Sequence, residues 1–212
     1  MLDTTRFISF EGIDFSGKTT QIHLLRNKLE QLGEKVTMLR EPGGTFISER
    51  IRDILLDEHH TNMTAFCELL LYSAARNQLV AEKISSALQS GNFVLADRYV
   101  DSTTAYQGYG RQLPLDFIRN LNQLVTHGVM PRITFLFELD LSQLHSRKKI
   151  RQSHSDRLEK EDLEFYNRIN TGYKKIARAQ KRRIKIINAN RSIEKIEIEI
   201  WEYVIKKLKL KL

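Results

Sequence analysis

Hydrophobic side chains gather along the chain in two kinds of segment. Five short apolar runs are typical of buried strands, and they are Phe7–Phe10, Val36–Leu39, Phe93–Ala96, Ile133–Phe137 and Ile184–Ile187. The segments between them are longer, and their apolar residues recur at helical spacing. This alternation predicts an α/β fold with a five-stranded, mainly parallel sheet flanked by helices. The loops that follow the strands then share one edge of the sheet, where ligands bind.

Three stripes mark the predicted helices most clearly. The first ends before Gly33, a residue that favours helix termination. The stripes comprise Leu24, Leu25, Lys28, Leu29 and Leu32, then Ile51, Ile54 and Leu55, then Leu69, Leu70, Leu79, Val80, Ile84 and Leu88.

Two segments depart from this pattern. Ser146–Glu161 is crowded with charge and poor in large apolar residues, so it cannot form a buried element. Val204–Leu212 alternates Lys and Leu weakly, which predicts a final helix that frays. The chain has no internal repeat and no low-complexity linker, and its 212 residues favour one domain over 1–212.

Composition and charge narrow the class of protein only a little. The formal net charge of +8 attracts anions, but it does not separate nucleic acid, nucleotides and acidic membranes. Apolar runs stay short of the roughly 20 residues that a membrane helix needs, and the N-terminus lacks a secretory pattern. Cys67 is the only cysteine, so no internal disulfide can form, and we expect it to be a small buried hydrophobe. We therefore expect a soluble, cytoplasmic protein.

A phosphate-binding loop follows the first strand. Residues 12–19 read Gly-Ile-Asp-Phe-Ser-Gly-Lys-Thr, which matches the G-x-x-x-x-G-K-[ST] pattern between a strand and a helix. Glycines let backbone N–H groups turn toward phosphate oxygens, and the helix N-terminus favours negative charge. Lys18 can reach the β- and γ-phosphates, and the Thr19 hydroxyl can bind Mg²⁺. The predicted ATP-binding residues are Gly12, Ile13, Asp14, Phe15, Ser16, Gly17, Lys18, Thr19 and Thr20.

Further motifs follow the other strands in a fixed order. They are Arg40-Glu-Pro-Gly-Gly-Thr45, Leu70-Leu-Tyr-Ser-Ala-Ala-Arg76, Asp97-Arg-Tyr99, Ser102-Thr-Thr-Ala-Tyr-Gln-Gly108 and Asp156-Arg-Leu-Glu159. This set resembles the thymidylate kinase family of P-loop nucleoside monophosphate kinases, in its bacterial form, over about Phe7 to Tyr173. The resemblance implies a P-loop NTPase fold and transfer of a phosphoryl group from ATP to dTMP with Mg²⁺. It also implies a homodimer, formed through helices that flank Leu69–Leu88.

The resemblance assigns roles in the acceptor pocket. Tyr72 stacks on thymine, and Arg76 donates to thymine O4, where cytosine presents an amino group instead. Tyr106 packs under the sugar and selects deoxyribose, while Gln107 faces the base. For both tyrosines the alternative is an ordinary core aromatic. Ser102 belongs to the same pocket or caps the helix that begins there.

The resemblance also assigns the charged groups around the phosphates. Arg98 holds the acceptor phosphate and steadies the transferring group, for which a guanidinium fork is suited. Asp97 holds Mg²⁺ with Thr19, or else forms a structural ion pair. Asp14 lies near the 3′-hydroxyl, and Arg52 reaches the acceptor phosphate or else lies on a solvated helix face. The predicted acceptor-binding set is Asp14, Glu41, Pro42, Arg52, Tyr72, Arg76, Arg98, Ser102, Tyr106 and Gln107.

The charged segment at about 146–158 resembles the lid of nucleotide kinases. An arginine-rich lid can close over ATP and add positive charge, and we expect Arg147 and Arg151 to touch the phosphates. Phe15 departs from the family, whose members have a small residue or an arginine in the loop. Because Phe15 carries no charge, the positive charge for catalysis must come from the lid. The predicted catalytic residues are Asp14, Lys18, Asp97, Arg98, Arg147 and Arg151.

The chemistry needs no strong base, because a phosphate acceptor is already ionised at neutral pH. This fits the six histidines, whose spacing shows no metal-ligand pattern. Two alternatives remain open. One is a kinase for another nucleoside monophosphate or a deoxynucleoside, and the other is a non-catalytic nucleotide-binding protein. Nucleic-acid binding is disfavoured, because no basic motif with interleaved aromatic residues accompanies the charge.

Overall fold

The five predicted strands all form. The computed structural model describes residues 2–143 and 157–210. Its strands are β1 (Phe7–Glu11), β2 (Val36–Arg40), β3 (Phe93–Asp97), β4 (Ile133–Glu138) and β5 (Ile184–Asn188). They pair in parallel in the order β2-β3-β1-β4-β5, which confirms the predicted sheet. Each strand runs one residue past its apolar run and ends on a polar or charged residue, so polar groups gather at the carboxyl edge.

The helices fill the segments between these strands. Their bounds are α1 (Lys18–Gln31), α2 (Phe46–Leu56), α3 (Ala65–Leu79), α4 (Ser85–Gln89), α5 (Val100–Thr103), α6 (Leu115–Val125), α8 (Leu163–Ala179) and α9 (Ile193–Leu208). Two π-helical segments, η1 (Val80–Ile84) and η2 (Thr104–Gly110), continue α3 and α5, and η3 (Leu158–Lys160) is a short 3₁₀ turn. No helix within the described ranges is long and apolar enough to cross a membrane.

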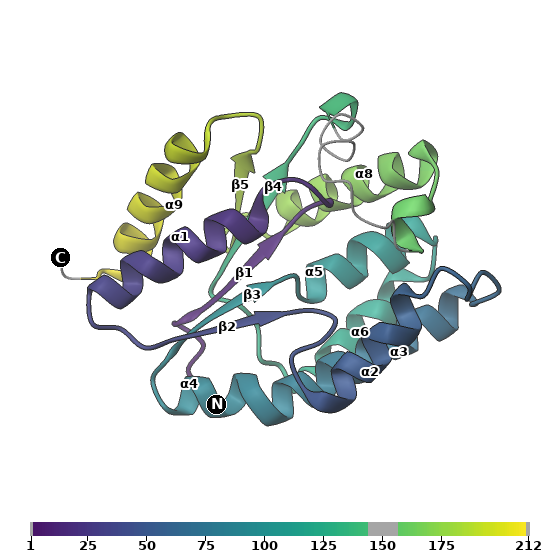
Figure 1. Ribbon diagram of the computed structural model, residues 1–212, viewed down its shortest axis with the longest axis horizontal. Helices are drawn as coiled ribbons and strands as arrows, with labels where there is room; N and C mark the ends of the chain where they lie inside the picture. Colours follow the sequence, from purple (N-terminus) through teal and green to yellow (C-terminus); the bar gives the residue numbers. More distant parts are fainter. Residues whose placement is uncertain (1, 144–156, 211–212) are drawn as a thin grey trace.

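Strand order and handedness together place the helices in two layers. The chain moves from β1 outward to β2, so a right-handed crossover sets α1 on one face. The later crossovers run in the opposite direction and set α2–α6 and α8 on the other face. Helix α9 returns to pack beside α1 (Figure 1).

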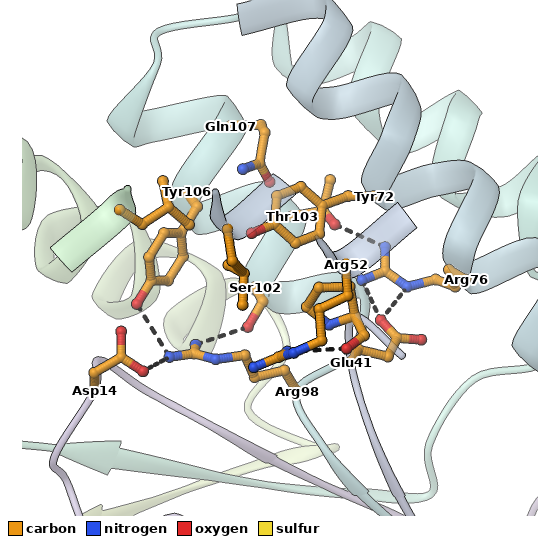
Figure 2. A pocket seen from close by; sticks show the side chains of 13 residues that line it. Asp14, Glu41, Arg52, Tyr72, Arg76, Arg98, Ser102, Thr103, Tyr106 and Gln107 are labelled. Atoms are coloured by element: carbon orange, nitrogen blue, oxygen red, sulfur yellow. Dashed lines mark hydrogen bonds and ion pairs between the residues drawn. The ribbon is translucent and has the colours of Figure 1, made fainter. Parts of the chain in front are cut away.

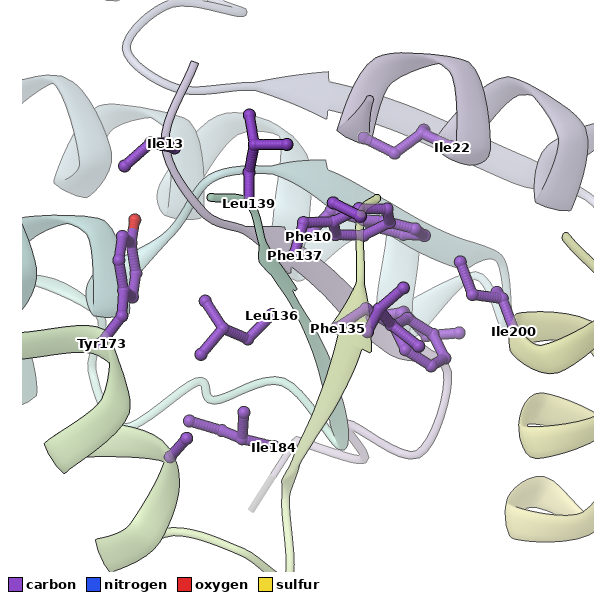
Figure 3. Close-up of a cluster of buried hydrophobic side chains, with 14 of the residues drawn as sticks. Phe10, Ile13, Ile22, Phe135, Leu136, Phe137, Leu139, Tyr173, Ile184 and Ile200 are labelled. Atoms are coloured by element: carbon purple, nitrogen blue, oxygen red, sulfur yellow. The ribbon is translucent and has the colours of Figure 1, made fainter. Parts of the chain in front are cut away.

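Aromatic side chains of the central strands fill the core beneath α1 and α9. Phe10 of β1 lies 5.5 Å from Phe135 and 6.1 Å from Phe137 of β4, measured between ring centroids. Ile22 of α1 and Ile200 of α9 complete this layer, as Figure 3 shows. The core thus holds β1 and β4 rigidly together, and the phosphate loop leaves the sheet from the end of β1.

The predicted final helix forms: α9 continues to Leu208, and Val204 is buried. Two expectations from the sequence are wrong. Leu32, Ile54 and Leu70 belong to the predicted apolar stripes but are exposed. Cys67 is also exposed, since it lies on the outer side of the first turn of α3.

Candidate active site

The phosphate loop is shaped by its glycine and its lysine. A Cβ on Gly12, whose φ is +133°, would meet the carbonyl oxygen of Phe137 at 2.5 Å, so only glycine fits between the loop and β4. The Lys18 ammonium donates to the carbonyl oxygens of Gly12 (3.1 Å) and Ile13 (2.8 Å). Burial, together with the nearby Arg98, lowers the pKa of Lys18 to about 8. The lysine is therefore fixed inside the loop by the loop's own carbonyl oxygens.

Phe15 adopts a conformation that is rare for its residue type. Its φ of 62° lies in the left-handed region, which bulky side chains seldom occupy. The ring is partly buried and packs against the main hydrophobic core. The residue of the loop that departs from the family is thus apolar and has a strained backbone.

Thr19 and Asp97 meet at the carboxyl edge of the sheet. The Thr19 hydroxyl donates to Asp97 Oδ2 at 2.8 Å. Two adjacent oxygen groups at the end of the phosphate loop form a donor set that suits Mg²⁺, which keeps several waters and binds few protein ligands. Within residues 2–143 and 157–210, no group of three or more His, Cys, Asp or Glu side chains is placed to hold a metal.

Arg98 is held in place by groups on three sides. Its guanidinium donates to Asp14 Oδ1 (2.6 Å), the Gly12 carbonyl (2.9 Å) and the hydroxyls of Ser102 and Tyr106 (3.2 Å each). Its φ of 73° is another left-handed value, so the turn after β3 is strained where it presents this side chain. Burial would lower the pKa of Arg98, but the Asp14 carboxylate raises it well above the ordinary value. The cation is fixed and permanently charged.

Glu11 supports this turn through buried hydrogen bonds, and no local sequence pattern indicates this role. The buried carboxylate accepts the backbone N–H of Tyr99 (2.8 Å) and the hydroxyls of Ser102 (2.6 Å) and Tyr173 (3.1 Å). Burial, with Asp101 nearby, raises the pKa of Glu11 to about 7. Ser102 lies within α5 rather than at its start, so the alternative that it caps this helix is wrong.

A cavity of about 90 Å³ lies beside Arg98. It is more closed than the cavity along the phosphate loop described below, and we call it the enclosed cavity. Every residue of the predicted acceptor-binding set lines it: Asp14, Glu41, Pro42, Arg52, Tyr72, Arg76, Arg98, Ser102, Tyr106 and Gln107. Figure 2 shows the labelled side chains converging from the phosphate loop, from the turns that follow β2 and β3, and from α2, α3, α5 and η2.

Arg52 and Arg76 line this cavity, and the guanidinium of each contacts other protein groups. Arg52 donates to the Pro42 carbonyl at 2.9 Å and lines the cavity, so the solvated-face alternative does not describe it. Arg76 is 2% exposed, and its guanidinium contacts Glu41 (2.5 Å), the Tyr99 carbonyl (3.0 Å) and two further side-chain oxygens. Each of its three guanidinium nitrogens thus donates to a protein acceptor. The longest of these bonds, 3.3 Å to Asn122, is the easiest to yield to a ligand.

The aromatic residues of the set lie on the cavity walls. Tyr106 is held between the Arg98 guanidinium, 5.1 Å from its ring centroid, and the edges of Phe165 and Tyr173. It is therefore both a core aromatic and part of the cavity. Tyr72 lies one helical turn before Arg76 on α3 and packs partly against the core. The π-helical geometry of η2, which often occurs at functional sites, carries Tyr106 and Gln107.

A second, open cavity follows the phosphate loop. It is lined by the loop residues from Asp14 to Thr20, by residues of β2 and by Asp97 and Arg98. Gly12 and Ile13 do not line it, because Ile13 is buried in the core and both take part only through their carbonyl oxygens. The two cavities share four side chains: Asp14, Glu41, Arg52 and Arg98. One ligand in each cavity would therefore meet at this shared wall.

The sequence missed three residues that line the enclosed cavity. Leu56 is an apolar residue without a motif, whereas Thr103 and Leu158 lie inside recognised motifs that assign them no role. A threonine next to the predicted Ser102 was a signal that could have been used. The predicted Arg147 and Arg151 lie outside the described residues, as does most of the charged segment at 146–158.

Comparison with known proteins gives one consistent result. The family model described as thymidylate kinase matches residues 10–200. A thymidylate kinase from Exiguobacterium sp. is 43% identical over 202 residues, which is 95% of each chain. One from Mycoplasma capricolum is 39% identical over 204 residues, or 96% of each chain. The crystal structure of thymidylate kinase from Ehrlichia chaffeensis superposes with a TM-score of 0.76 at 34% identity, covering 93% of this chain and 97% of that one.

Proposed function

This chain belongs to the thymidylate kinase family, and from this membership we propose how its residues share the work of phosphoryl transfer. The reaction is ATP + dTMP giving ADP + dTDP. The observation that carries the division of roles is the wall shared by the two cavities. ATP occupies the loop cavity, dTMP occupies the enclosed cavity, and their phosphates meet beside Asp14 and Arg98.

Arg98 is the central catalytic group in this proposal. It lines both cavities and is held by four protein contacts, so its charge is in place before either substrate arrives. A fixed cation at the point where negative charge shifts lowers the barrier without reorganisation during the reaction. Arg52 joins Arg98 on the acceptor phosphate. Asp14 orients Arg98 and accepts the 3′-hydroxyl of dTMP.

The base and sugar are recognised at the inner end of the enclosed cavity. Tyr72 stacks on thymine, Arg76 reaches thymine O4, and Gln107 faces the ring edge. Tyr106 lies under the sugar and leaves no room for a 2′-hydroxyl, which its tight packing supports. Glu41, Pro42 and Ser102 complete the walls.

Thr19 and Asp97 hold Mg²⁺ in this proposal, Asp97 through water. When bound, the ion neutralises part of the phosphate charge. Lys18 binds the β- and γ-phosphates. The attacking oxygen of dTMP is already ionised, so positioning and charge stabilisation suffice, and no residue needs to act as a strong base.

We retain Arg147 and Arg151 as sequence predictions for the γ-phosphate. The neutral Phe15 supports them, because the loop offers no arginine at that position. Alanine in place of both arginines should then lower kcat strongly, and an unchanged kcat would remove this role.

We also propose that the protein is a homodimer and acts in the cytoplasm, where both nucleotides are available. Exposed apolar side chains on α3 and α6 support the dimer: Phe66 and Leu70 on α3, and Phe117 and Leu124 on α6. The rings of Phe66 and Phe117 lie 5.9 Å apart, which joins the two helices into one patch. Contiguous exposed apolar surface of this kind marks interaction sites.

An ADP-release assay with dTMP, dUMP, dCMP and dGMP tests the acceptor. We expect dTMP to give the highest kcat/KM. Release of ADP with dCMP but not with dTMP would favour a kinase for another monophosphate, an alternative to which the relatives named above lend no support. Full turnover by Lys18→Ala would contradict the role given to the loop, since removal of one such charge-stabilising group costs about 10² to 10³ in kcat.

A further inference from the structure

Glu68 is a buried carboxylate that lies behind the acceptor cavity. It stands in the first turn of α3, is 1% exposed, and is not among the residues that line the cavity. Burial alone would raise its pKa, but Arg111, Gln107 and Arg157 outweigh burial and hold the pKa below its usual value. Glu68 therefore stays ionised at neutral pH. A charge taken out of water at this position is costly unless its partners are fixed.

The partners of Glu68 come from segments far apart in the sequence. Its Oε1 accepts from Gln107 Nε2 at 2.9 Å, within η2. Its Oε2 pairs with Arg111 Nη2 at 3.0 Å and with Arg157 Nη2 at 2.6 Å. One carboxylate thus binds a residue of the base pocket and two arginines at the same time.

The contact with Gln107 fixes the direction of its amide. An ionised carboxylate can only accept hydrogen bonds, so the amide nitrogen must be the atom that faces Glu68. The amide oxygen is then left for the cavity, into which the Gln107 side chain points near Tyr72 (Figure 2). An oxygen there accepts the N3–H of thymine or uracil. Cytosine presents an acceptor at N3, so the same oxygen would repel it.

The contact with Arg157 fixes part of the cavity wall. Arg157 also donates from Nε to the Leu55 carbonyl at 3.1 Å, at the end of α2. The next residue, Leu158, lines the cavity together with Leu56. Glu68 thereby holds the wall on one side of the base and the amide on the other.

We propose that Glu68 is a positioning residue that sets the preference for an N3–H base by orienting Gln107. This inference rests on the proposed function, because it assumes that the base lies in the enclosed cavity. It adds a selectivity element outside the set that contacts the acceptor.

The test is Glu68→Gln, which keeps the shape but can present either oxygen or nitrogen to Gln107. We expect KM for dTMP to rise about tenfold and the ratio of kcat/KM for dTMP over dCMP to fall about tenfold. KM for ATP should stay within about twofold, because Glu68 has no contact with the loop cavity. Unchanged KM and selectivity, or a parallel loss of both substrates, would overturn the proposal.

A matched control is Glu161→Gln. Glu161 also pairs with Arg111, at 2.7 Å, but its carboxylate has no contact with Gln107 among the described residues. This variant should keep the selectivity of the wild type. If it loses as much selectivity as Glu68→Gln, the effect comes from Arg111 and the proposal is wrong.

A double-mutant cycle with Gln107→Met tests the route. If Glu68 acts through Gln107, adding Glu68→Gln to Gln107→Met should cause no further loss of selectivity, whereas additive losses would overturn the proposal. Should Glu68→Gln fail to fold, Glu68→Asp keeps the negative charge but draws the carboxylate back from its partners, Gln107 included, and retained selectivity in that variant would also overturn the proposal. A wild type without dTMP activity would instead refute the proposed function.

Discussion

Phe15 occupies its position in the phosphate loop with a strained backbone. A left-handed φ costs a residue with a Cβ about 1 kcal/mol or more, and glycine avoids this cost. The partly buried ring recovers some of it by packing against the core. At this position the side chain thus stabilises the fold while the backbone conformation destabilises it.

This strain predicts an unusual order of stability at position 15. Phe15→Gly and Phe15→Ala both lose the ring, but only alanine keeps the strain. We expect the glycine variant to be more stable than the alanine variant by about 1 kcal/mol in urea denaturation. The reverse order, which holds in ordinary loops and helices, would show that φ at this position is negative in solution.

The lowered pKa of Lys18 predicts that the protein takes up protons when ATP binds. In the free protein its pKa is lowered to about 8, so about half of the molecules carry a neutral lysine at pH 8. The phosphates favour the charged form, and the missing proton is taken from the buffer. Calorimetric titration at pH 8 in two buffers of different ionisation enthalpy should show uptake of about half a proton.

The control for this prediction is the same titration at pH 6.5, where Lys18 is already charged and uptake through it should vanish. Equal binding enthalpies in both buffers at pH 8 would contradict the lowered pKa.

The lowered pKa of Lys18 also makes the free energy of unfolding depend on pH. The unfolded chain binds more protons between about pH 8 and the ordinary value of 10.5, so this group stabilises the fold less as the pH falls through that range.

At the scale of elements, the packing of α8 against η2 holds the acceptor cavity in shape. Gly172 of α8 lies against the Tyr109 ring of η2, and a Cβ there would come within 2.5 Å of Tyr109 Cδ2. The segment that carries Tyr106 and Gln107 is therefore supported through a close approach that only glycine allows.

We expect Gly172→Ala to lower the free energy of unfolding by about 2 kcal/mol and to raise KM for dTMP, because η2 must shift. KM for ATP should change little. Thr171→Ala is the matched control, since Thr171 lies next in sequence on the same helix and is exposed. A variant with unchanged stability and KM would show that α8 and η2 are not packed this closely.

Much of this arrangement could be predicted from the sequence, for a physical reason. Buried parallel strands are continuous apolar runs, and the loops that bind phosphate need glycine and lysine at fixed spacing. The functional residues at the carboxyl edge, such as Asp97 and Arg98, follow those runs directly. Their place in the structure is therefore fixed by their place in the chain.

The remaining features depend on contacts between distant segments. Glu11 and Glu68 are buried because of partners up to 162 and 89 positions away, and no local pattern records this. The π-helical turns of η1 and η2 are likewise invisible in the apolar periodicity. Residue type alone predicts that Cys67 is buried, whereas its place on the outer side of α3 leaves the side chain exposed.

At the scale of the whole molecule, the exposed patch on α3 and α6 predicts association. Leu124 is 70% exposed and Leu70 is 51% exposed, and a second copy could cover both. The double variant Leu70→Glu with Leu124→Glu should convert a dimer into a monomer in sedimentation analysis, because like charges would face each other across the two-fold axis.

Ile198→Glu is the control, since Ile198 is 53% exposed but lies on α9, on the opposite face of the sheet. It should leave the dimer intact. A wild type that sediments as a monomer, or a dimer that survives the double variant, would contradict the proposed interface.

The exposed Cys67 allows association through this surface to be followed by the rate of thiol labelling. It is the single thiol of the chain, and it directly follows Phe66 of the patch on α3. A maleimide or disulfide reagent can therefore be attached at one known point without engineering. If two chains meet over α3, the rate of labelling should fall as the protein concentration rises, and the concentration at half-rate would give the strength of the association.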